Sequence, residues 1–569
     1  MTGRPKTGDE LFELVKSDLA FAKETYGVDI IAVCTDDGPD GKKMRRLIKE
    51  QMPWLAAFEC WAHQSSLITG NYLSIKAPWM AAAKLAIEVI KWFNHHGTAL
   101  DLLRAQQRLS FDRILALILP VITRWVSQYC SLRRLKKLER AIRACVITHE
   151  ERLRVCAGRK DEQIEAAEHI IGIVKDDTFW KNIERIASDL EPLAIASNLL
   201  QAPTCRLDTV LMCLGNLHRI FSQNDDTTVK STVTKSLERR WAKTDQELMI
   251  LAVFLNPYIR WRAFNHSKLP SMSLYHMILR AYQRFYSRDA TTDIELMETF
   301  QSYLDGLDHF SDIAMWLNGF KTMYETSKQP VDITAIWKRM DTGPELTGRG
   351  GFVKLAIRIL SIVPNSAGPE RIFSAYGITH TKHRNRLNPQ KVHKSTVVRM
   401  DCMESHRAAG LVPQRRARHF SLADDQAAMA AMDADSVSPA LDGGHSAGPS
   451  AANANDMDFG VVTDLLINLA AGEDAEDAAA AADTSITTNT PSSHTSSSAS
   501  IIDPVLRLPS YKKIKLADLF KYPEPGAPAE ELEFFWKGGV NGLDEEESSH
   551  EEEIQDSRSE NEGTEVNTV

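Results

Sequence analysis

The sequence predicts a largely helical protein that begins with a short α/β segment and ends in an acidic tail. Three observations support this fold class. Residues 1–77 show a strand, helix, strand pattern, residues 78–340 show amphipathic helices almost without strand signals, and the charge changes sign along the chain. From Ser421 onward we count 7 basic and 30 acidic residues, a net of −23, which leaves +14 on the residues before it. The total of −9 therefore conceals a basic body with an acidic tail.

The α/β segment opens with apolar residues at helical spacing over residues 11–21. The run at 28–35, VDIIAVCT, is short, β-branched and apolar, which predicts a buried strand that ends at Asp36. A basic helix with the sequence KKMRRLIKEQM follows, and residues 55–60 predict a second strand. This order of elements indicates part of an α/β sheet.

After the helical block, residues 333–340 and 352–362 predict two helices separated by a glycine-rich loop. The tail combines low hydrophobicity with like charge, so we expect it to be disordered. Within it, residues 461–469 and 504–536 carry apolar side chains and are expected to fold on a partner. The predicted domains are a partial α/β segment at 1–77, a helical domain at 78–340, a C-terminal segment at 341–405 and the tail at 406–569.

The eight cysteines lie in the body at irregular spacings without a Cys-x-x-Cys pair, which is typical of a reducing compartment. The N-terminus lacks the apolar stretch of a signal peptide. No apolar run reaches the ~18 residues that a membrane-spanning helix needs. The sequence therefore predicts a soluble intracellular protein with no membrane partner.

The segment at 362–387, IVPNSAGPERIFSAYGITHTKHRNRL, closely resembles the C-terminal signature of the hAT superfamily of transposases. That signature is Ser-Ala-x-x-Glu-Arg-x-Phe-Ser, then Gly and Arg-Asn-Arg-Leu. Further blocks follow the family order upstream: CTDDGPDGKKMRRL, ECWAHQSSLI, TRWVSQY and AVFLNPYIR, where Asn256 replaces the usual Asp. The resemblance spans about residues 11–400 and excludes the tail. It implies an RNase H-like core, interrupted by a large all-α insertion domain, and a C-terminal dimerisation region.

In this superfamily, two Asp and one Glu hold two divalent metal ions, Mg²⁺ or Mn²⁺, for DNA cleavage and strand transfer. Asp36 matches the second Asp of this DDE triad and Glu370 matches the Glu. No residue takes the place of the first Asp, and no Cys/His array replaces the N-terminal zinc module. The resemblance thus implies an N-terminally truncated member with two remnant metal ligands, and we expect catalysis to be lost. Without the resemblance, Asp36 would be interpreted as a turn-forming residue, and Glu370 as part of a surface ion pair with Arg371.

Other blocks suggest contacts with nucleic acid. Arg124 and Trp125 suit a phosphate contact and stacking on an unpaired base, although a tryptophan in a helical domain also suits the core. Cys60 and His63 form half of a zinc pattern, so we interpret them as core residues, with His63 able to position a phosphate.

The C-terminal signature also carries a basic cluster and an apolar surface. Lys382, Arg384 and Arg386 suit the DNA backbone or a solvated helix face. Residues expected to pack against a second copy, or else to fill the core, are Phe373, Tyr376, Ile378, Leu387 and Val392. Basic residues at 415–418 suit a nuclear import signal.

The leading hypothesis is a nuclear, transposase-derived protein that forms homodimers and binds DNA without cutting it. Two alternatives stay open. In the first, the chain is an incomplete representation of an active DDE-type transposase. In the second, it is a transcription-regulating protein that recruits partners through its acidic tail.

Overall fold

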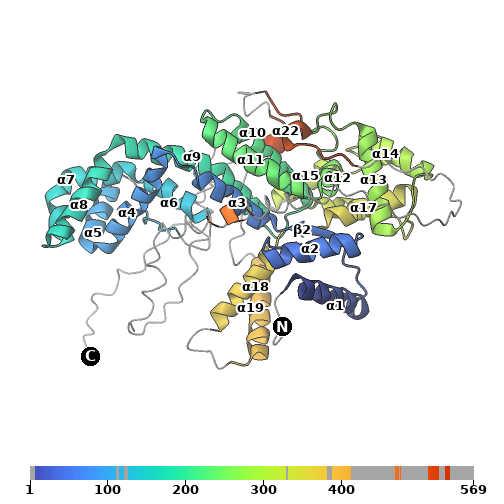
Figure 1. Ribbon diagram of the computed structural model, residues 1–569, viewed down its shortest axis with the longest axis horizontal. Helices are drawn as coiled ribbons and strands as arrows, with labels where there is room; N and C mark the ends of the chain where they lie inside the picture. The colour runs from blue at the N-terminus through green and yellow to red at the C-terminus, as the bar shows by residue number, and fades with distance from the viewer. Residues whose placement is uncertain are drawn as a thin grey trace, which may run out of the picture.

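The computed structural model describes residues 7–110, 114–120, 126–327, 331–380, 387–409, 411, 468, 470–472, 475, 511–524 and 532–537. It is predominantly helical, as the sequence predicts. The helical body is elongated, and an N-terminal unit and a helical hairpin project from one side of it (Figure 1).

The predicted strand, helix, strand unit is present near the N-terminus. It consists of α1 (Gly8–Tyr26), β1 (Ala32–Thr35), α2 (Pro39–Gln51) and β2 (Ala56–Glu59). The strands are parallel, and their register runs from Ala32 opposite Ala56 to Thr35 opposite Glu59. β1 is shorter than the apolar run that predicted it, and its four residues are half-buried rather than buried as expected.

The two faces of this small sheet pack against different layers. On one face, Ala57 joins Phe12 of α1 and Met44 and Ile48 of α2 in a small hydrophobic cluster. On the other face, Phe58 joins the main core of the helical body. Alternate residues of β2 therefore face opposite layers, as the period of two in a strand requires.

In the sequence, the helical block lies between the strands and the C-terminal hairpin, and its helices share one hydrophobic core. In chain order it comprises α3 (Trp61–Leu73), η1 (Pro78–Met80), α4 (Ala81–His95), α5 (Gly97–Ser110), α6 (Val126–Lys137), α7 (Glu139–Ala157), α8 (Asp161–Lys175), α9 (Asp177–Leu200), α10 (Leu207–Ser222), α11 (Thr227–Lys243), α12 (Gln246–Phe254), α13 (Ser271–Tyr286), α14 (Ile294–Asp305), η2 (Asp308–Phe310), α15 (Leu317–Thr326), α16 (Ile333–Arg339) and α17 (Gly348–Leu360).

The glycine-rich stretch before α17 differs from its prediction as a loop, since α17 already begins at Gly348. A Cβ at Gly351 would lie 2.4 Å from the Tyr282 hydroxyl oxygen of α13. Glycine at this position therefore permits two helices to approach closely, which a local sequence pattern does not reveal.

A hairpin of α18 (Ala367–Thr379) and α19 (Pro389–Ala408) follows α17 and projects beside α1 and α2 (Figure 1). The two helices pack against each other. α19 extends slightly beyond the domain end that the sequence suggested at residue 405.

Part of the acidic tail returns to the helical body. We call residues 511–524 and 532–537 the strap; it includes α22 (Leu516–Leu519) and α23 (Phe534–Lys537). α22 packs on α10 and α11, as Figure 1 shows. The apolar island at 504–536, expected to fold on a partner, thus has its described residues packed on its own chain. Apart from residue 468, the island at 461–469 lies outside the described residues, as does most of the remaining tail.

Candidate functional site

The candidate site lies at the carboxyl edge of the two-stranded sheet. Because the strands are parallel, Asp36 after β1 and Cys60 after β2 emerge at the same edge. The Cys60 backbone N–H donates to the Thr35 carbonyl at 2.7 Å and fixes the two strand ends side by side.

Two successive aspartates at this edge have opposite environments. Asp36 is exposed, whereas Asp37 is buried and forms an ion pair with Arg45 of α2. Arg45 also donates to the Asp36 carbonyl at 2.6 Å, and Gln64 donates to Asp37 at 3.1 Å. Burial alone would raise the pKa of Asp37, but Arg45 and Lys42 outweigh it and hold that pKa below its ordinary value. Asp37 therefore holds the turn together, and the Asp36 carboxylate faces solvent.

Glu370 is brought to the same edge by the first turn of α18. Ser366, which precedes that helix, donates its backbone N–H to the Cys60 Sγ at 3.3 Å. Its hydroxyl oxygen lies 3.1 Å from the same sulfur and 2.8 Å from the Glu370 Oε1. Since a hydroxyl carries one proton, it donates to one of these acceptors at a time. The structure thus gathers both predicted triad positions at one edge of the sheet.

The Cys-x-x-His block lies beneath this edge. Cys60 is fully buried and His63 is half-buried. The pKa of Cys60 is lowered to about 6, chiefly by a hydrogen bond from the Cys34 thiol. Burial opposes this shift, and the hydroxyl and backbone N–H of Ser366 add to it. Cys60 consequently serves as an acceptor that anchors the start of α18, in keeping with its interpretation as a core residue.

DNA cleavage in the hAT superfamily requires divalent metal ions, so the residues at this edge are compared with what a metal site needs. Carboxylate oxygens such as those of Asp36 and Glu370 are suitable ligands for Mg²⁺ or Mn²⁺. In the described part of the chain, however, no three His, Cys, Asp or Glu residues are grouped closely enough to hold an ion. The described residues therefore do not fit a two-metal site, and we derive no reaction step through one.

A basic pocket opens beside the carboxyl edge, between α2 and the end of α11. Its volume is about 270 Å³. Five basic and two acidic side chains line it: Lys42, Arg45, Arg46, Lys49, Lys243, Asp37 and Glu59. Arg45 is already engaged by Asp37, whereas Arg46 and Lys49 are exposed to solvent. The excess of positive charge suits a phosphate group. Sequence reasoning missed this pocket because α11 joins it from a distant part of the chain.

The other predicted DNA contacts cannot be placed in the same way. Arg124, Trp125, Lys382, Arg384 and Arg386 all lie outside the described residues. Their contact with nucleic acid stays a prediction.

The predicted dimer residues divide into two groups within the α18 and α19 hairpin. Phe373 is 68% exposed, whereas Val392 is only 7% exposed and packs inside the hairpin. The Tyr376 hydroxyl lies 2.7 Å from the His393 Nδ1 and joins the two helices. Leu387 is half-buried; Ile378 belongs to α18, but its side chain lies outside the described residues.

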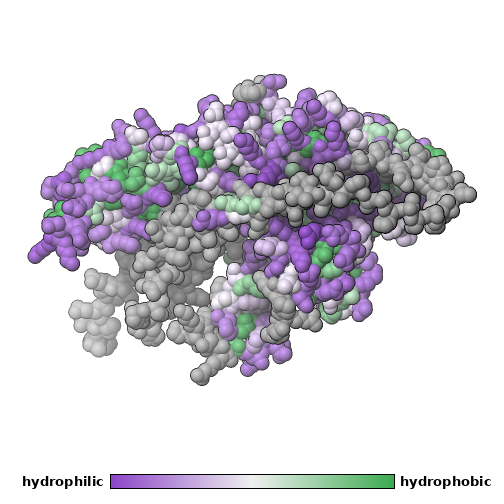
Figure 2. Space-filling model, viewed as in Figure 1, coloured by the Kyte–Doolittle hydropathy of each residue, from purple (hydrophilic) through white to green (hydrophobic). Residues whose placement is uncertain are grey.

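Two exposed valines of α19 add to the apolar surface of the hairpin. Val397 and Val398 are 50% and 62% exposed, and Val398 had no place in the predicted dimer surface. Figure 2 shows hydrophobic residues at the surface where the hairpin projects. Together with Phe373, they leave an apolar surface that a second copy can cover.

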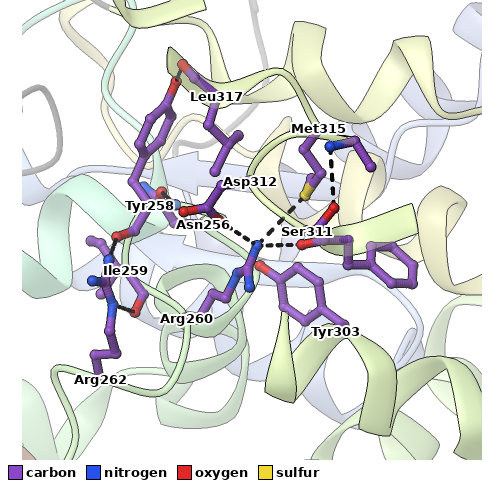
Figure 3. Close-up of polar contacts among 12 residues, drawn as sticks. Asn256, Tyr258, Ile259, Arg260, Arg262, Tyr303, Ser311, Asp312, Met315 and Leu317 are labelled. Carbon is purple, nitrogen blue, oxygen red and sulfur yellow. Dashed lines mark hydrogen bonds and ion pairs between the residues drawn. The ribbon is translucent and has the colours of Figure 1, made fainter. Parts of the chain in front are cut away.

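The AVFLNPYIR block has a structural role in the helical body. Arg260 donates to the Phe310 carbonyl and to Asp312, and the Tyr258 hydroxyl donates to the Leu317 carbonyl at 2.8 Å (Figure 3). The block thereby ties the end of α12 to the segment between η2 and α15.

The surroundings of Asn256 explain why this block has Asn where the family usually has Asp. Its side-chain amide donates to the Asp208 Oδ2 at 2.9 Å, and both residues have no exposed surface. An Asp here would place a second carboxylate against Asp208 in the core, so asparagine suits this chain.

Among the helices that the structure describes, none is long and apolar enough to cross a membrane.

No curated protein matches the chain. Residues 322–401 match the model of the hAT family C-terminal dimerisation region. The match runs from α15 through the α18 and α19 hairpin and includes Glu370. This part of the chain is therefore similar to the dimerisation region of the hAT family of transposases.

Proposed function

We propose that this protein is a hAT-derived nuclear dimer that binds DNA without cleaving it. The dimerisation region supports the homodimer. The observation that carries the DNA-binding proposal is the basic pocket, because it adjoins the edge where Asp36 and Glu370 lie. The scaffold inferred from the family is an RNase H-like core with a helical insertion.

The charge of the pocket favours the DNA backbone over base recognition. Arg46 and Lys49 are exposed and able to reach phosphate oxygens, while Arg45 is fixed in the pocket wall. Such contacts neutralise phosphates and release counterions, so the binding should weaken steeply with salt and depend little on sequence.

The proposal of binding without cleavage comes from the carboxylates at the same edge. A two-metal reaction needs several ligands to hold both ions and to stabilise charge on the attacking and leaving oxygens. Asp36 and Glu370 supply two carboxylates, and the described residues around them add no further group of ligands.

The test incubates the full chain with a labelled DNA duplex in Mg²⁺ and, separately, in Mn²⁺. We expect a slower complex on a native gel and intact strands on a denaturing gel. Shortened strands from the wild-type chain, absent with Asp36→Ala and Glu370→Ala, would establish the active-transposase alternative. Strands shortened equally by the variants would reveal a contaminating nuclease.

A further inference from the structure

The pocket between α2 and the end of α11 has an excess of positive charge. Its five basic and two acidic side chains give a net charge of 5 − 2 = +3. The strap adds to this charge, because Lys512 and Lys513 are exposed and Lys513 donates to the carbonyl of Ala242, which precedes the pocket residue Lys243. Like charges gathered in this way repel one another, so a bound anion lowers their energy.

A strongly acidic segment follows the strap in the sequence. Residues 544–553, DEEESSHEEE, carry seven acidic side chains and no Lys or Arg, and we call them the acidic run. The strap ends with α23 at Lys537, so six residues, 538–543, separate it from the run. Even when fully extended, the chain from Lys537 to Asp544 spans at most ~25 Å. The run therefore starts within that distance of the strap.

A series of contacts connects the end of the strap to the pocket. The Trp536 ring lies 5.5 Å from the Tyr522 ring, and the Tyr522 hydroxyl donates to the Leu516 carbonyl at 2.9 Å. The Leu516 N–H donates to Glu238 of α11 at 3.0 Å, and the pocket residue Lys243 follows Glu238 by five positions in the same helix. Five residues of an α-helix rise about 7.5 Å. The pocket thus lies within reach of a segment that begins so soon after the strap.

We propose that the acidic run occupies the basic pocket of its own chain and competes there with the DNA backbone. The competition rests on the proposed DNA binding, whereas the occupancy of the pocket does not. The same Lys and Arg side chains bind carboxylates and phosphates, so a segment with successive carboxylates presents charges like those of a nucleic-acid strand. Because the run belongs to the same molecule, it competes at a higher effective concentration than a free peptide would.

A zero-length carbodiimide cross-link tests the occupancy without DNA. The reagent joins a carboxylate to a lysine amine in contact with it, and the water that is lost converts the carbodiimide into a urea. The full chain is treated in low salt, and the band with the mass of one chain is digested with trypsin, which cleaves after Lys537 and Arg558 and isolates the run in one peptide. We expect mass spectrometry to find this peptide linked to Lys49 or Lys243.

Two results of this experiment would overturn the occupancy. One is the absence of any link between the run and a lysine of the pocket, whether or not the run is linked to a lysine elsewhere, such as Lys181 of α9. The other is a link to the pocket found only in the band with twice the mass, because the run would then belong to the second copy.

DNA affinity tests the competition with two full-length variants that change the net charge equally. One replaces four glutamates of the run: Glu546→Gln, Glu547→Gln, Glu551→Gln and Glu552→Gln. The other replaces four acidic residues elsewhere in the tail: Glu473→Gln, Asp474→Asn, Glu476→Gln and Asp477→Asn. In fluorescence anisotropy at low salt, we expect the first variant to bind a labelled duplex about tenfold more tightly than wild type, and the second to bind like wild type.

Equal tightening by both variants would overturn the competition, since it would show an effect of overall charge rather than of the pocket. Wild-type affinity in the first variant would overturn it as well. If none of the three proteins binds DNA, the proposed function and the competition both fail, whereas the cross-link still decides the occupancy.

Discussion

The backbone N–H of Ser366 lies 3.3 Å from the Sγ of Cys60, although 306 positions separate the two residues. This contact joins the start of α18 to the end of β2. The Trp61 N–H also donates to the Pro364 carbonyl, at 3.0 Å, and reinforces the same junction. The C-terminal segment therefore packs at the carboxyl end of the two-stranded sheet, although the helical block separates the two in the sequence.

The Cys60 junction should depend on pH. The pKa of Cys60 is lowered from 9.0 to about 6, so the folded state favours the thiolate. A depressed pKa adds stability that is complete above the unfolded-state value and is lost as pH falls through about 6. We expect the stability difference between wild type and Cys60→Ala, measured by denaturant unfolding, to shrink from pH 9 to pH 5.5. Parallel pH profiles of the two proteins would contradict this coupling.

The adjacent aspartates offer a matched pair of substitutions. Asp37→Asn removes the nearer carboxylate from buried Arg45 and leaves only Glu59, 3.8 Å away, as its charged partner, which should cost about 3 kcal/mol in the free energy of unfolding. Asp36→Asn alters an exposed carboxylate and should change stability by no more than ~0.5 kcal/mol. Chemical denaturation of both variants checks this contrast, and equal losses would show that the environments of Asp36 and Asp37 are wrongly assigned.

Asn256→Asp restores the usual family residue but should destabilise this chain. The new carboxylate would face Asp208 in the core, at a cost of ~3 kcal/mol near neutral pH, because two adjacent buried carboxylates cannot both ionise without penalty. The loss should diminish in acid, where one carboxyl is protonated. Adding Asp208→Asn recreates an amide and carboxylate pair and should recover part of the stability. Thermal unfolding of the single and double variants measures the recovery, and its absence would mean that Asp208 is not the cause.

The sequence predicted those features that depend on local pattern. The run VDIIAVCT predicted β1 and the basic stretch after it predicted α2, because the hydrophobic pattern of a few neighbouring residues indicates local secondary structure. The sequence did not predict which of Asp36 and Asp37 is buried. Asp37 is held inside by Arg45 of α2 and Gln64 of α3, and these contacts exist only in the folded chain. The close approach of Gly351 to Tyr282 was hidden for the same reason. The strap was recognised as an apolar island, but its binding surface is assembled only by the folded helical block.

The basic pocket predicts how DNA affinity responds to salt. Removing a side chain that neutralises one phosphate should reduce the slope of log K against log salt by about 1. We expect this result for Arg46→Ala and for Lys49→Ala in fluorescence anisotropy titrations with a labelled duplex. Lys181→Ala, an exposed lysine of α9 outside the pocket, is the control and should leave the slope unchanged. Equal effects at all three positions would indicate binding by overall charge rather than by the pocket.

The dimer surface allows a substitution with an internal control. Phe373 is exposed on α18, so Phe373→Asp should weaken self-association while leaving the hairpin folded. Val392 is buried between the helices, and Val392→Asp should instead lower stability by a few kcal/mol through an unpaired buried charge. Circular dichroism distinguishes the two results. Loss of stability in Phe373→Asp would show that this residue belongs to the core.

Sedimentation velocity of the full chain with a fluorescent DNA duplex tests the central claim most directly, because one experiment reports both association and DNA binding. We predict that the label sediments with two copies of the chain in low salt, and that Phe373→Asp shifts it to a smaller complex. A wild-type chain that sediments as a monomer at micromolar concentration, or a duplex that sediments alone at every protein concentration, would contradict a DNA-binding dimer.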